Sequence, residues 1–130
     1  MDKKLDILVI EDDSELQFMF SEFARLVNHN YFSATSGKES INLVEDNFYH
    51  LIFLDYNLED MDGLEIYNIA KNKTKNSKFV IMSGSVDLVK NKFNNKGNII
   101  DFLEKPFSFE MFRDIISKIE SDRDIQLFEM

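Results

Sequence analysis

The stretch His50-Leu51-Ile52-Phe53-Leu54-Asp55-Tyr56-Asn57 decides the fold. Its four consecutive apolar residues, 51–54, are typical of a strand that is buried on both faces, as in the middle of a parallel sheet. The run ends at the carboxylate of Asp55. Open parallel sheets bind their ligands beyond the carboxyl ends of the strands, so Asp55 is the first candidate for a functional residue.

Length and composition describe a single folded domain. The chain has 130 residues, of which 44% are hydrophobic and 13 are phenylalanine, and this is too apolar for a disordered segment. No apolar run approaches the roughly 20 residues of a membrane span, and the N-terminus lacks the apolar core of a signal peptide. The absence of cysteine excludes a disulfide framework and a cysteine-ligated metal. We therefore expect a cytoplasmic protein with no membrane partner, and the net charge of −9 disfavours nucleic acid as a partner.

Four other short apolar segments have the composition of strands, at residues 5–10, 31–35, 79–82 and 99–103. The mixed polarity of residues 31–35 favours an edge strand. Helix starts are indicated by capping residues: Ser14 with Gln17, Ser36 with Glu39, Asp62 with Glu65, and Ser108. A weaker helix is predicted at about residues 86–93, before a loop rich in Asn and Lys that reaches residue 98. Five strands that alternate with five helices predict an α/β fold, a doubly wound parallel sheet with right-handed crossovers.

Polar residues follow the predicted strands at the point where each strand ends. Glu11 and Asp12 end the first strand, Asp55 the third, Ser83 the fourth and Lys105 the fifth. Because the carboxyl ends of parallel strands meet at one edge of a sheet, the sequence predicts that these side chains form a site.

The chemistry of these residue types points to phosphoryl transfer. Three neighbouring carboxylates repel one another unless a cation lies among them. Oxygen ligands without His or Cys favour Mg²⁺, which also binds phosphate oxygens. A lysine and a hydroxyl can contact the oxygens of a transferring phosphoryl group, and an aspartate can itself be the nucleophile. The pattern therefore predicts formation of an aspartyl phosphate on Asp55.

Residues 5–120 resemble the receiver domain of bacterial two-component response regulators, of the stand-alone type found in chemotaxis. Five features match that family's pattern in order: the acidic pair Glu11-Asp12, the phosphoacceptor Asp55, and the pairs Asp62-Gly63, Ser83-Gly84 and Lys105-Pro106. Each is weak alone, but five in register across one domain are a strong signal. The resemblance implies a flavodoxin-like receiver fold with sheet order 2-1-3-4-5 and a site where the strand order reverses, between strands one and three.

The resemblance also implies a role for each matching residue. Asp12 and Asp55 would bind Mg²⁺ directly, as would the backbone carbonyl of Asn57, while Glu11 would act through water. Lys105 would contact the phosphoryl group, and Ser83 would move to it after transfer. Phe102 matches the aromatic residue that turns inward when the hydroxyl moves. The peptide bond between Lys105 and Pro106 would be cis.

One motif can be aligned with the family pattern in two ways, and two positions depart from that pattern. Three acids are consecutive, and the family's pair directly follows the strand, which selects Glu11 and Asp12 and leaves Asp13 in the loop. Glu59 stands where the family usually has proline, which would loosen the loop after Asp55. Ser83 replaces the commoner threonine, so the hydroxyl is kept and a methyl group is lost.

Two alternatives from other classes are open. A haloacid-dehalogenase-like phosphatase also uses an aspartyl nucleophile with Mg²⁺, but there the nucleophile ends the first strand in an Asp-x-Asp pair. A flavodoxin-like ligand-binding domain would need a phosphate-binding loop after the first strand, where this chain instead has three acids and no Gly-rich loop. On the predicted first helix, Phe18 is either an exposed aromatic residue, the reading we favour, or a docking contact for a phosphodonor.

We expect a signalling switch rather than a conventional enzyme, one that catalyses only its own phosphorylation and dephosphorylation. Residues 1–122 would form the receiver domain, and residues 123–130 a C-terminal tail or an extension of the last helix. We expect no effector domain to follow, so the output would be contact with a downstream protein target that the sequence does not identify. The phosphodonor would be a sensor histidine kinase or a histidine phosphotransfer protein.

Overall fold

The computed structural model describes residues 4–93 and 97–129, with side chains described as far as residue 122. The elements in chain order are β1 (Asp6–Ile10), α1 (Ser14–Leu26), β2 (Asn30–Ala34), α2 (Gly37–Asp46), β3 (Leu51–Asp55), α3 (Gly63–Lys73), β4 (Lys78–Ser83), α4 (Val86–Val89), the 3₁₀ turn η1 (Lys90–Lys92), β5 (Ile99–Glu104) and α5 (Phe109–Glu129). Residues 123–129, which the sequence left as either a tail or an extension, continue α5. The predicted loop before β5 lies partly outside the described residues.

The five strands form one parallel sheet in the order β2-β1-β3-β4-β5, which confirms the predicted fold class and strand order. The apolar run of residues 51–54 lies in β3, the central strand of the sheet, and all five residues of β3 are buried. β2 lies at the edge, as its mixed polarity predicted.

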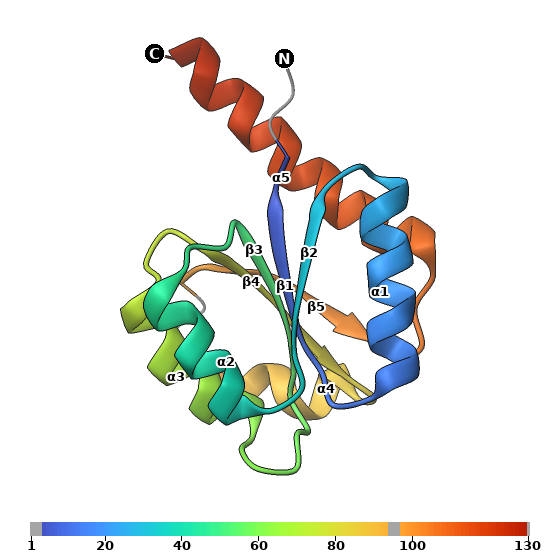
Figure 1. Ribbon diagram of the computed structural model, residues 1–130, viewed down its shortest axis with the longest axis vertical. Helices are drawn as coiled ribbons and strands as arrows, with labels where there is room; N and C mark the ends of the chain where they lie inside the picture. The colour runs from blue at the N-terminus through green and yellow to red at the C-terminus, as the bar shows by residue number, and fades with distance from the viewer. Residues whose placement is uncertain (1–3, 94–96, 130) are drawn as a thin grey trace.

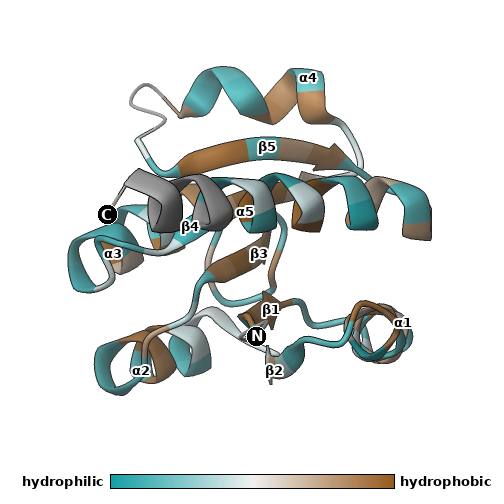
Figure 2. Cartoon of the chain, turned by 90° about the horizontal axis from the view of Figure 1, so that it is seen from above, coloured by the Kyte–Doolittle hydropathy of each residue, from teal (hydrophilic) through white to brown (hydrophobic). Residues whose placement is uncertain are grey.

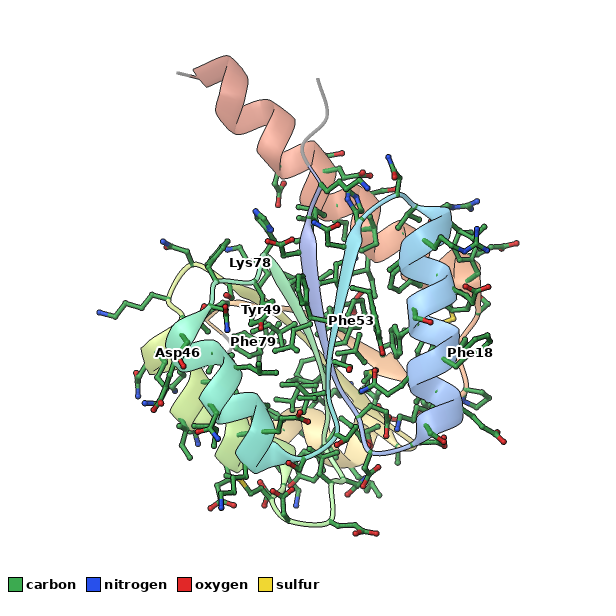
Figure 3. All side chains as sticks on the ribbon, viewed as in Figure 1. Phe18, Asp46, Tyr49, Phe53, Lys78 and Phe79 are labelled. Carbon is green, nitrogen blue, oxygen red and sulfur yellow. The ribbon has the colours of Figure 1, made fainter. Side chains whose placement is uncertain are left out.

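Helices cover both faces of this sheet, so the molecule has three layers (Figures 1 and 2). α1 and α5 pack on one face and α2 and α3 on the other. Alternate residues of each strand enter different cores because successive side chains of a strand point to opposite faces. In β1, Ile7 and Val9 join the core under α1 and α5, whereas Leu8 and Ile10 join the core under α2 and α3. In Figure 3, Phe53 lies inside the molecule and Phe18 projects outward from α1.

Three of the four predicted helix starts are confirmed. Hydroxyl oxygens of Ser36 and Ser108 and a carboxylate oxygen of Asp62 accept hydrogen bonds from backbone N–H groups in the first turns of α2, α5 and α3. The weak helix predicted near residues 86–93 is present as the single turn α4 followed by η1.

The fourth helix start was wrong by one residue. Asp13, not Ser14, is the N-cap of α1, and its Oδ1 accepts from the backbone N–H groups of Glu15 and Leu16 at 2.9 and 3.3 Å. Gln17 therefore does not complete a capping box. Its side chain turns inward instead and is buried between α1 and the ends of β1 and β2.

The two histidines of the chain anchor the start of β1. Nδ1 of His29 accepts from the backbone N–H of Leu5, and Nδ1 of His50 accepts from that of Asp6, each at 2.9 Å. Within the described residues, no helix is long and apolar enough to cross a membrane.

Candidate functional site

Three carboxylates meet at the carboxyl edge of the sheet, where the loops after β1 and β3 gather at the bottom of Figure 1. β1 and β3 are neighbours with Ile10 opposite Leu54, and this register places Glu11 beside Asp55. One oxygen from each of Glu11, Asp12 and Asp55 lies within 4.8 Å of the others. Glu11 and Asp55 are buried, at 1% and 3% exposure, whereas Asp12 is exposed.

Lys105 brings the only cation that contacts this trio among the described side chains. It lies in the loop after β5, and its backbone N–H donates to the carbonyl of Ser83 at 2.9 Å. Its Nζ lies 2.5 Å from Oε1 of Glu11 and 3.2 Å from Oδ2 of Asp55. The adjacent bond to Pro106 is cis, as the resemblance implied.

Burial and charge shift the ionisation of this cluster. Burial, aided by the negative charge of Asp55, raises the pKa of Glu11 to about 7, although the hydrogen bond from Lys105 acts in the opposite direction. Burial acts to lower the pKa of Lys105, but the bonds and charges of Glu11 and Asp55 outweigh it, so the pKa of the lysine is raised. Lys105 therefore stays charged at neutral pH, while Glu11 can exchange a proton there.

The loop after Asp55 is held by its own backbone and by a glycine. The N–H of Asn57 donates to Oδ1 of Asp55 at 3.1 Å, and the N–H of Gly63 donates to the carbonyl of Tyr56 at 2.7 Å. A Cβ added at Gly63 would lie 2.7 Å from Cα of Tyr56 and 3.3 Å from the carbonyl oxygen of Asp55. A side chain at position 63 would thus displace the backbone that carries Asp55.

The same loop is tied to α2, which offsets the loosening that Glu59 was expected to cause. Asp60 accepts from the backbone N–H groups of Gly37 and Lys38 at 2.9 and 3.0 Å. These backbone bonds lower the pKa of the Asp60 carboxyl. Its neighbour Met61 fills the space beside Gly37, where an added Cβ would lie 2.7 Å from Sδ.

Ser83 ends β4 and is buried at 2% exposure next to Asp55, because Met82 of β4 lies opposite Asp55 in the sheet. Its Oγ accepts from the backbone N–H of Ser85 at 3.1 Å. A surface hollow of about 390 Å³ opens beside it, lined by residues that include Asn57, Gly84 and Leu88. Phe102 of β5 is half-buried, with its ring centroid 5.8 Å from that of Phe93.

The structure thus brings Glu11, Asp12, Asp55 and Lys105 into one cluster and places Ser83 and Asn57 at its border. Asp13 is set apart because its carboxylate caps α1. Phe18 is 68% exposed, which agrees with an exposed aromatic residue and does not by itself indicate docking. Sequence reasoning missed Asp60, whose partners lie 22 and 23 residues away, and the inward position of Gln17.

The donor set of the carboxylate trio fits a small divalent cation. All candidate ligand atoms are oxygens, and two of the three side chains are buried where an unbalanced negative charge is costly. Hard oxygen donors with room for water suit Mg²⁺ better than the transition metals that prefer His or Cys.

Comparison with known proteins agrees with this geometry. Residues 7–117 match the Response regulator receiver domain family. The chain therefore belongs to that family, and it is a receiver domain of the kind used in two-component signalling systems.

Individual proteins of known sequence or structure are also similar to this chain. The chain is 30% identical over 101 residues to the cell cycle transcriptional regulator CtrA of Caulobacter vibrioides, covering 78% of this chain and 44% of CtrA. It is 26% identical over 114 residues to sporulation initiation phosphotransferase F of Bacillus subtilis, covering 86% of this chain and 90% of that protein. Its fold matches the response regulator TrrA of Thermotoga maritima, in complex with Mg²⁺ and BeF, with a TM-score of 0.79 at 20% identity and coverage of 90% and 99%. The chain spans about half the length of the first curated relatives that it matches.

Proposed function

We propose that this receiver accepts a phosphoryl group on Asp55 from the phosphohistidine of a sensor histidine kinase or a histidine phosphotransfer protein. The observation that supports this most is the position of Asp55. It ends the central strand, is buried among carboxylates, and has a lysine amine 3.2 Å from Oδ2. A carboxylate in such a place is a nucleophile whose attack on phosphorus would be assisted by a fixed positive charge.

The proposed ligands of Mg²⁺ are the side chains of Asp12 and Asp55 and the backbone carbonyl of Asn57, with Glu11 acting through water. The ion, when bound, supplies positive charge that offsets the carboxylates and the phosphoryl oxygens. The TrrA structure, which contains Mg²⁺ and BeF, supports this choice of cofactor.

In the transfer step a carboxylate oxygen of Asp55 bonds to phosphorus, and the bond from phosphorus to the donor's imidazole nitrogen breaks, so the imidazole leaves with that electron pair. Lys105 is proposed to donate to a phosphoryl oxygen, and Ser83 to donate its O–H to another once its side chain turns from the N–H of Ser85. Phe102 is proposed to turn inward in the same state. Hydrolysis of the acyl phosphate by water would return the receiver to its resting form.

This proposal assigns no other catalytic activity to the chain: it catalyses only its own phosphorylation and dephosphorylation. Its output would be contact with a downstream protein target. The net charge of −9 makes a direct nucleic-acid contact by this domain unfavourable, although the relative CtrA is a transcriptional regulator.

Intact-mass measurement after treatment with acetyl phosphate tests the proposal. The wild type should gain the mass of one phosphoryl group with Mg²⁺ and not with a chelator, and Asp55→Asn should gain none. Asp13→Asn is the matched control, because it removes a neighbouring carboxylate that lies outside the trio, and it should label normally. Full labelling of Asp55→Asn would assign the acceptor elsewhere, first to Asp12. Turnover of a generic phosphatase substrate would favour the haloacid-dehalogenase-like alternative.

A further inference from the structure

The side-chain amide of Gln17 connects the ends of two strands beneath the acidic loop. The residue lies in α1 and is only 8% exposed. Its Nε2 lies 3.0 Å from the carbonyl oxygen of Val9, 2.9 Å from that of Glu11 and 3.1 Å from that of Ala34. One amide group therefore reaches three backbone carbonyls where β1 and β2 end.

The other end of the amide is held by Tyr31 of β2. The Tyr31 hydroxyl bonds to Oε1 of Gln17 and lies 3.1 Å from the backbone carbonyl oxygen of the same residue. Because the three carbonyls can only accept hydrogen bonds, the nitrogen of the amide must face them and its oxygen must face Tyr31. The orientation of Gln17 is thus determined on both sides.

The contact with the Glu11 carbonyl has a consequence for metal binding. That carbonyl belongs to the peptide group between Glu11 and Asp12, two members of the carboxylate trio. The Glu11 N–H donates to the carbonyl of Ala34 at 3.0 Å, and its Oε2 accepts from the N–H of Asp13 at 3.1 Å. Asp12 is exposed, so the backbone that Gln17 holds, rather than packing around the side chain, sets where its Cβ lies.

We infer that Gln17 is a positioning residue for the acidic pair, which fixes the Glu11–Asp12 peptide so that both carboxylates face Asp55 before a cation binds. This inference rests on the proposed function. It assigns Gln17 no contact with substrate or cation. Side chains that orient metal ligands without touching the metal typically change metal affinity by about 10- to 100-fold when they are lost.

A buried glutamine that satisfies carbonyls could also serve stability alone, and the experiment separates the two roles. Gln17→Met keeps the length of the side chain and removes the amide. Val44→Ala is the control, because Val44 is buried in α2 on the opposite face of the sheet and its truncation lowers stability without reaching the acidic loop. Mg²⁺ affinity is measured by titration calorimetry, since the chain has no tryptophan to report binding by fluorescence. The temperature is chosen so that each variant is folded by circular dichroism.

Gln17→Met should bind Mg²⁺ about tenfold more weakly than the wild type. Val44→Ala should keep the wild-type affinity even where its thermal stability is equally reduced. At saturating Mg²⁺, Gln17→Met should recover most of the rate of labelling by acetyl phosphate, because the defect lies in ligand placement and not in Asp55. Tyr31→Phe provides a milder test that keeps the amide. It removes the hydroxyl that orients Gln17 and should weaken Mg²⁺ binding in the same direction, by less.

Wild-type affinity in folded Gln17→Met would overturn the inference, as would an equal loss in Val44→Ala. Should Gln17→Met fail to fold, Tyr31→Phe decides, and unchanged affinity there would reject the role. These results differ from failure of the proposed function, which would show in the wild type itself as no Mg²⁺ binding or no label on Asp55.

Discussion

The amine of Lys105 lies 2.5 Å from Oε1 of Glu11, a carboxylate that is almost wholly buried. The lysine follows the last strand of the sheet and the glutamate follows the first, so the fold joins residues 94 positions apart into one ion pair. Without a divalent cation, the Lys105 amine is the positive charge that contacts the trio. Net repulsion nevertheless remains, because three carboxylates share one lysine.

The first prediction concerns this residual repulsion. Mg²⁺ should raise the melting temperature of the wild type, because it binds the folded cluster and not the unfolded chain. Asp12→Ala should lose most of that increase. Asp13→Ala should keep it, although its melting temperature without Mg²⁺ should fall through loss of the α1 cap, which is worth about 1 kcal/mol. Melting curves of the three proteins with Mg²⁺ and with chelator give all six values, and the opposite pattern would place the acidic pair one residue later.

The second prediction follows from the raised pKa of Glu11, about 7 in the folded protein and about 4.5 when unperturbed. Between these values the folded protein holds a proton that the unfolded chain has released. Raising the pH through this window should therefore destabilise the metal-free protein, with the full penalty present above pH 7. Glu11→Gln should lack this contribution.

Melting temperatures of both proteins in chelator at several pH values from 5 to 8 provide the measurement. All other titratable groups are the same in the two proteins. The difference between the two curves isolates Glu11. Parallel curves would show that Glu11 is already ionised throughout the window.

The third prediction concerns Gly63. Gly63→Ala should destabilise the protein by about 1–3 kcal/mol and slow phosphorylation, because the new Cβ would lie 2.7 Å from the backbone of Tyr56, next to Asp55. Gly84→Ala is the matched control. A Cβ there meets nothing within 4 Å, so its stability should change by no more than roughly 0.5 kcal/mol. Urea unfolding measures both changes, and equal stability losses would contradict the packing argument.

Much of the site could be predicted from the sequence because its signals are local. The apolar run of β3 and the acid after it are adjacent in the chain, and parallel pairing carries Glu11, Asp55, Ser83 and Lys105 to one edge whatever the details of packing. The order of the strands was also predicted correctly, but that prediction came from the family resemblance and not from hydrophobic periodicity.

Contacts that depend on long-range geometry could not be predicted. Ser14 and Gln17 have capping-box spacing, but Asp13 caps one residue earlier, and the Gln17 amide finds carbonyls of β1 and β2 that only the folded sheet brings together. Asp60 likewise caps α2, which lies more than 20 residues before it. The loop near Glu59 is therefore held by the Asp60 carboxylate, whose partners in α2 no local sequence pattern identifies.

The last prediction concerns the switch. A phosphoryl group can favour an active arrangement only through contacts that it makes there and not in the resting one. The Ser83 hydroxyl accepts from the N–H of Ser85, and its own O–H is proposed to donate to a phosphoryl oxygen once the side chain turns. Ser83→Ala should therefore still accept the group on Asp55 but respond weakly in the amide spectrum of α4, β5 and the start of α5. Phe102 has no hydroxyl with which to bind a phosphoryl oxygen directly. Its inward turn should therefore depend on the space that the Ser83 side chain leaves when it moves.

Amide shifts with and without beryllofluoride, in wild type and Ser83→Ala, make the comparison. Ser85→Ala is the control, because it keeps the backbone N–H that holds Ser83 and should respond as the wild type does. The Ser83→Ala substitution itself alters the resting spectrum, so only the change on adding beryllofluoride is compared. Equal changes in wild type and Ser83→Ala would reject coupling through the hydroxyl, and Lys105 would be the next proposed contact to test.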